Sequence, residues 1–109
     1  ARDMLAEILA IAGEIGSRPV GIGALDVSAG YGAWREEWDR AARFFGLSQA
    51  QLVETGLQRD PTDEAFLVPL IDQARAALGA AFEALEREGR AWSYEQGIRE
   101  ARAWLAGAS

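Results

Sequence analysis

Residues 67–85, LVPLIDQARAALGAAFEAL, carry the longest uninterrupted helical pattern in the chain. Apolar residues recur there at alternating intervals of four and three: Leu67, Ile71, Ala74, Leu78, Ala81 and Leu85. This period is typical of an amphipathic helix that packs against other helices. We expect the helix to begin near Asp60–Pro61, which suits an N-cap and first helical position, and to end at Gly89. Pro69 should kink it, or split it near Val68.

Similar periods occur elsewhere in the chain, over residues 2–15, 31–45 and from 93 to about 106. Capping boxes are expected at Ser48 with Gln51, which would open a short helix, and at Ser93 with Gln96. The length fits one domain, residues 1–109. We therefore predict an all-α fold: an antiparallel bundle of four main helices plus one short helix.

The segment between the first two predicted helices, residues 16–30, reads GSRPVGIGALDVSAG and shows no helical period. Its density of glycine, serine and proline predicts a long Gly-rich loop between helices one and two, or a loop containing a short strand. Long connections inside compact domains often have a function, which makes this segment a candidate binding surface.

The composition excludes several chemistries. The chain has no cysteine, histidine or lysine, and all 11 basic residues are arginine. Thiolate nucleophiles, histidine bases, Schiff-base lysines and Walker-type phosphate lysines are therefore ruled out. The glycine spacing at 21, 23, 30 and 32 does not match G-x-G-x-x-G. We predict no catalytic residues, no metal and no cofactor.

The formal net charge of −6 disfavours nucleic-acid phosphates and anionic membrane surfaces as partners. No apolar run approaches the roughly 18 residues of a membrane-spanning helix. These features predict an acidic, soluble, cytoplasmic protein.

Most charged residues are expected to lie on the exposed surfaces of the predicted helices. Within the predicted helices and at their ends, acid-then-arginine pairs at i,i+4 spacing, each worth about 0.2–0.5 kcal/mol, occur five times: Glu36–Arg40, Asp39–Arg43, Glu83–Arg87, Glu86–Arg90 and Glu95–Arg99. Arg18 lies in the predicted loop, outside these helical pairs, where it is a candidate to bind a carboxylate or phosphate.

By elimination, the sequence favours a non-enzymatic protein–protein interaction module, such as an adaptor, a regulatory or assembly subunit, or a helical domain of a larger complex. The partner would be another protein chain, in a homo- or hetero-oligomer. The predicted partner-binding residues come from the loop and the start of the next helix: Arg18, Ile22, Leu25, Tyr31 and Trp34.

Two alternatives stay open. One is a small helical enzyme or ligand-binding bundle that uses arginine and glutamate in an internal pocket, so enzymatic activity is not decided. The other is a DNA-binding regulator, because GLSQAQL, residues 46–52, resembles the second-helix opening of repressor-type helix-turn-helix proteins. That resemblance implies a recognition helix next, where the chain instead has the acidic residues Asp60, Asp63 and Glu64.

Serine at both Ile22 and Leu25 distinguishes a binding loop from a loop that folds back to cap the bundle. If these side chains cap the bundle, the melting temperature should fall, because each buried aliphatic side chain contributes about 1.5–3 kcal/mol. If they bind a partner, stability should hold while partner capture is lost. Thermal unfolding and capture by the still-folded fraction separate the two outcomes.

Overall fold

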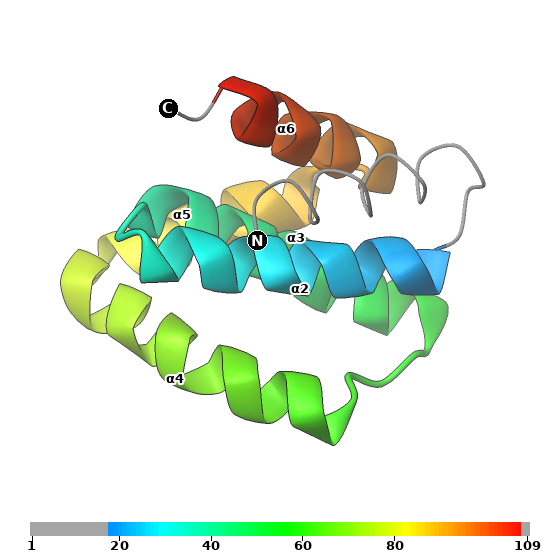
Figure 1. Cartoon of the computed structure of the whole chain (residues 1–109), viewed down its shortest axis with the longest axis horizontal. Coiled ribbons are helices and arrows are strands. Elements are labelled where there is room, and N and C mark those ends of the chain that lie inside the picture. The colour runs from blue at the N-terminus through cyan, green and yellow to red at the C-terminus, as the bar shows by residue number, and fades with distance from the viewer. Residues whose placement is uncertain (1–17, 108–109) are drawn as a thin grey trace.

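The computed structural model describes residues 18–107, and this range consists of five helices and short connections (Figure 1). The helices are α2 (Arg18–Trp34), α3 (Trp38–Thr55), α4 (Pro61–Leu78), α5 (Ala81–Ala91) and α6 (Tyr94–Gly107). No strand occurs between residues 18 and 107, which confirms the all-α prediction. The helix predicted over residues 2–15 lies outside the described residues. None of the helices between residues 18 and 107 combines the length and the apolar character of a membrane-spanning segment.

Helix α3 is the centre of the arrangement, since α2, α4, α5 and α6 all pack against it. Figure 1 shows α2 and α4 side by side and running in the same direction, with α6 on the other side of α2. The core between these helices contains fully buried large side chains from four of them: Leu25, Phe44, Leu47, Leu67, Ile71 and Leu105.

The predicted Gly-rich loop is wrong for the described part of residues 16–30, because α2 is helical from Arg18 onward and contains no strand. Gly21, Gly30 and Gly32 are points of close contact rather than turns. A Cβ at Gly21 would fall 1.6 Å from the hydroxyl of Tyr94 on α6. Small residues here let neighbouring helices approach, and this tertiary packing outweighs the low helix propensity of glycine.

The helix predicted over residues 31–45 is in fact the end of α2 and the start of α3. The backbone N–H of Glu37 donates to the carbonyl of Gly32, and that of Glu36 to Ala33, at 2.8 and 3.0 Å. These two bonds form a Schellman motif with Glu36 at the left-handed position, where φ is 62°. Glycine usually occupies this position, so no residue type marks the helix end in advance.

The short helix predicted from Ser48 is also wrong, because α3 continues through this residue to Thr55. Gly46 does not end a helix. A Cβ there would lie 2.1 Å from the carbonyl oxygen of Glu86, and one at Gly89 would lie 1.9 Å from that of Arg43. The two glycines therefore allow α3 and α5 to cross with their backbones in direct contact. Residues 46–52, which resemble the opening of a helix, lie instead inside α3.

The strong pattern over residues 67–85 is divided between two helices. Helix α4 runs through Pro69 without splitting at Val68 and ends at Leu78, with Gly79 at a φ of 59°. The predicted starts are confirmed. The Asp60 carboxylate accepts from the N–H of Thr62, at 2.8 Å. The Ser93 hydroxyl similarly accepts from the N–H of Gln96, at 3.1 Å.

Alanine at Gly46 should destabilise the protein by about 1–3 kcal/mol, because its methyl group would push α3 and α5 apart. Gly23 is the matched control, since a Cβ at this position would have no neighbouring atom within 4 Å. Alanine at Gly23 should stabilise α2 by about 0.5–1 kcal/mol through helix propensity. Urea unfolding of both variants tests this, and equal effects would contradict the close crossing.

Candidate functional site

An apolar groove runs along the surface between α2 and α4, with a volume of about 290 Å³. The α2 wall has the spacing of a single helix face, since its residues stand at i, i+3, i+4 and i+7, and the α4 wall has two residues one turn apart. The lining residues are Val27, Gly30, Tyr31, Trp34, Phe66 and Leu70. Trp34 is 72% exposed, and Phe66 and Val27 are 48% and 43% exposed. Large apolar side chains are thus concentrated on one open face.

The walls of the groove are held by contacts beneath it. A Cβ at Gly30 would fall 2.6 Å from the ring of Phe66, so the absence of a side chain lets that ring lie against the α2 backbone. Tyr31 packs on Trp104 of α6, with ring centroids 5.8 Å apart, and stacks with Trp34 at 6.2 Å. Arg35 lies over the Tyr31 ring. These contacts fix the aromatic side chains while leaving Trp34 largely in solvent.

The structure separates the five residues that the sequence grouped as a partner-binding site. Tyr31 and Trp34 lie together in the groove. Ile22 and Leu25 are 3% and 0% exposed, and Leu25 belongs to the hydrophobic core. Both side chains are packed inside the protein, so we expect serine at both positions to lower its stability. The side chain of Arg18 lies outside the described part of the structure.

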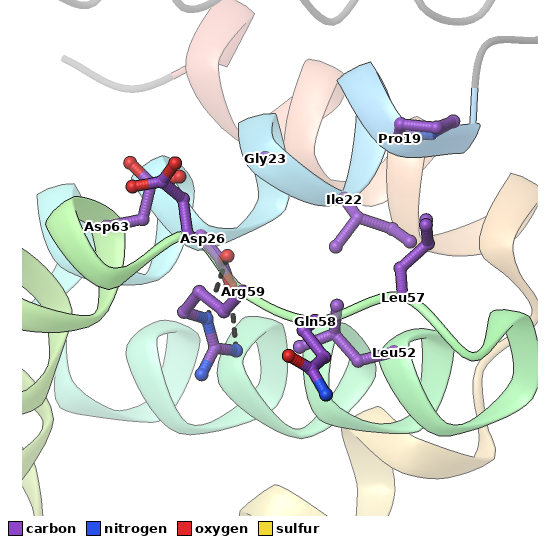
Figure 2. Close-up of a pocket in the computed structure, with 10 residues that line it drawn as sticks. Pro19, Ile22, Gly23, Asp26, Leu52, Leu57, Gln58, Arg59 and Asp63 are labelled. Carbon is purple, nitrogen blue, oxygen red and sulfur yellow. Dashed lines mark hydrogen bonds and ion pairs between the residues drawn. The ribbon is translucent and has the colours of Figure 1, made fainter.

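Beside the groove, near the start of α4, is a smaller pocket of mixed character, with a volume of about 190 Å³ (Figure 2). It is lined by α2, by α3, by the connection into α4 and by the first turn of α4: Pro19, Ile22, Gly23, Asp26, Leu52, Leu57, Gln58, Arg59, Asp60 and Asp63. Typical small-molecule sites are roughly 300–1,000 Å³. This pocket is therefore small for a ligand of that kind.

A buried ion pair between Asp26 and Arg59 forms part of the wall of this pocket. The Nε of Arg59 lies 2.9 Å from Oδ2 of Asp26, and its NH2 group donates to Oδ1 at 3.1 Å. Both side chains are only 5% exposed. Ser48 of α3 donates its hydroxyl proton to Oδ1 of the same carboxylate. The pair therefore connects α2, α3 and the segment that precedes α4.

Arg59 has further partners that complete its hydrogen bonding. Its NH2 group also donates to Gln49, at 2.8 Å, and NH1 donates to Glu64, at 3.1 Å. Burial opposes the charged form of Arg59, but the hydrogen bonds and attraction from Asp26 and Glu64 outweigh it and raise the pKa of the guanidinium. The charged and polar groups of this cluster hydrogen-bond to one another, so the cluster serves as a structural contact between α2, α3 and α4.

Surface ion pairs partly follow the predicted pattern. Glu86 and Arg90 form the expected i,i+4 pair, at 3.4 Å. Arg43 instead reaches Glu88 on α5, at 3.3 Å, and so connects two helices. Glu37 accepts a hydrogen bond from the indole N–H of Trp104, at 3.1 Å. Within residues 18–107, no three carboxylate side chains are grouped to hold a metal ion.

Comparison with protein-family models, with curated proteins and with solved structures finds no match for this chain. Its site is therefore defined by its own geometry. The sequence missed Val27, Phe66 and Leu70 as groove residues. The spacing of Phe66 and Leu70, one position before the buried pair Leu67 and Ile71, was the available signal for a second apolar row on this helix.

Replacing Arg59 with methionine should destabilise the protein by about 3–5 kcal/mol, because the Asp26 carboxylate would stay buried without a cation. Glu64→Gln is the control. It removes only the half-exposed partner of Arg59 and should cost less than about 1 kcal/mol. The double variant Asp26→Leu/Arg59→Met should recover much of the loss. Urea unfolding measures the stability of all three variants. Equal losses of stability for Arg59→Met and Glu64→Gln would contradict a stabilising role of the buried ion pair.

Proposed function

We propose that this chain is a non-enzymatic protein–protein interaction module, and that the groove between α2 and α4 binds another protein chain. The observation that carries the proposal is the exposure of Trp34, Phe66 and Val27 side by side on one face. Contiguous exposed apolar surface is typical of interaction sites, since covering it releases water from apolar groups.

The residue types support the same conclusion. Tryptophan and tyrosine are enriched among the residues that dominate binding energy at protein interfaces. Tyr31 is already fixed between Trp104 and Arg35 in the free protein. A side chain that is ordered before binding loses little conformational entropy on binding, so this face is suited to a partner of substantial affinity.

The alternatives have less support. A ligand-binding or catalytic role for the mixed pocket would use Asp26 and Arg59, whose charges are directed at each other. A DNA-binding role would need a cationic surface, whereas the connection into α4 and its first turn carry Asp60, Asp63 and Glu64. An adaptor, or a regulatory or assembly subunit, in the cytoplasm, fits the groove and the acidic composition.

A photo-crosslinking amino acid in place of Trp34 should capture the partner in an extract of the source cells. The same amino acid in place of Val53 is the control, because Val53 is an apolar residue of α3 that is 85% exposed and lies outside the groove. We expect specific adducts at position 34 that are absent at position 53, identified by mass spectrometry.

Identical adducts at positions 34 and 53 would refute a binding role for the groove. Trp34→Ala should change the free energy of unfolding by no more than about 0.5–1 kcal/mol, since most of this side chain is already in solvent. With the crosslinking amino acid placed instead at Val27, which also lines the groove, loss of the adducts in a Trp34→Ala background would therefore report binding and not misfolding. An adduct of twice the chain's mass, crosslinked to a peptide of this same chain, would identify a second copy as the partner.

A further inference from the structure

The mixed pocket and the apolar groove follow one another along one face of α2 and one face of α4. On α2, Gly23 stands one turn before Val27, and on α4, Asp63 stands one turn before Phe66. Gly23 and Asp63 both line the mixed pocket, while Val27 and Phe66 both line the groove. At 1.5 Å per residue, the row from Gly23 to Trp34 is about 16 Å long, or three turns of helix.

Two helices, α2 and α4, form the walls of this row, and glycine forms parts of its floor. Gly30 lets Phe66 lie against α2, and the position of a Cβ at Gly23 has nothing within 4 Å of it. An amphipathic helix binds in such a groove through apolar residues at i, i+3, i+4 and i+7, which is a recurrent mode of peptide recognition.

The end of the row nearest the start of α4 is acidic. Asp60 and Asp63 are both exposed, and no ion pair among residues 18–107 involves either of them. The nearby guanidinium of Arg59 is directed inward to Asp26 and also pairs with Glu64. A partner that places a cation at this end would therefore meet two carboxylates whose charge no ion pair of the described helices offsets, and its opposite charge would favour one orientation.

A second copy of this chain suits the surface less well. A stable interface between globular proteins covers roughly 800 Å² on each partner, whereas each large aromatic side chain supplies only about 150–250 Å². Six residues line the apolar groove. A second copy would also bring another Asp60 and Asp63 to an acidic chain with a net charge of −6.

From this geometry we infer that the groove binds an amphipathic helix of about three turns from a partner protein, with a lysine or arginine at the end that lies beside Asp60 and Asp63. The inference rests on the proposed function and specifies the chemistry of the partner. Trp34 and Phe66 contact the apolar face of the bound helix, and the two carboxylates determine its direction.

A displayed library of random 16-residue peptides tests this inference. Selection on the wild-type protein, with counter-selection against Trp34→Ala, should enrich peptides with apolar residues at helical spacing and a basic residue toward one end. Selection on the charge-reversed variant Asp60→Lys/Asp63→Lys should instead enrich acidic residues at that end. Asp63→Lys alone serves if the double variant unfolds, because Asp63 does not cap α4.

The enriched peptide, synthesised with a fluorescent label, should bind the wild-type protein in an anisotropy titration. Trp34→Ala should weaken binding at least tenfold, and Val53→Ala should leave it within twofold. A scrambled peptide of the same composition should not bind. Circular dichroism of each variant checks that it is folded, and Trp34→Ala keeps the test valid even if a change at Phe66 destabilises α4.

The inference is overturned if selection enriches no helical apolar spacing, if basic residues show no dependence on Asp63, or if the scrambled peptide binds equally. It is also overturned if sedimentation shows a dimer that Trp34→Ala disrupts, since a second copy then occupies the groove. A partner crosslinked at position 34 together with failed peptide selection would refute the helical ligand and leave the proposed function standing. Absence of any adduct at position 34 would refute both the helical ligand and the proposed function.

Discussion

The buried ion pair between Asp26 and Arg59 holds the start of α4 beside α2, and therefore determines where α2 and α4 meet. Arg59 immediately precedes the N-cap of α4, and its guanidinium reaches Asp26 on α2 and Ser48 on α3. A charge removed from water is strongly destabilising unless it is paired, so this connection cannot shift without exposing or orphaning a charge. With the start of α4 fixed beside α2, Phe66 arrives opposite Gly30, and the groove follows.

Periodicity and capping residues predicted only the parts of the fold that local sequence controls. The starts of α4 and α6 follow from Asp60 and Ser93, whose side chains accept backbone hydrogen bonds within one turn. Gly46 and Gly89 were wrongly predicted to end helices, because glycine commonly ends a helix and its neighbours in space are unknown from sequence. In the structure these glycines let α3 and α5 cross in contact. The break after α2 has no glycine, since Glu36 itself is left-handed. The buried ion pair joins residues 33 positions apart, beyond the reach of any local pattern.

Only the α2 wall of the candidate site was predictable from the sequence. Tyr31 and Trp34 stand out as aromatic residues one turn apart, but their opposite wall depends on which helix lies beside α2. The sequence also grouped Leu25 with them because this segment was taken for a loop, in which neighbouring residues share a surface. In a helix, Leu25 instead faces the core, while Val27 faces solvent.

The same contacts that stabilise the fold also keep the groove open. Tyr31 is held from below by Trp104, and Phe66 is already against the α2 backbone, so neither ring can turn inward to hide its exposed face. Closing the groove would need α4 to move, and Arg59 resists that movement through its bonds to α2, to α3 and to α4 itself. The exposure of Trp34 is thus a consequence of the contacts that fix Tyr31, Phe66 and α4. A change at Arg59, which lies outside the apolar lining, would alter the groove through the position of α4.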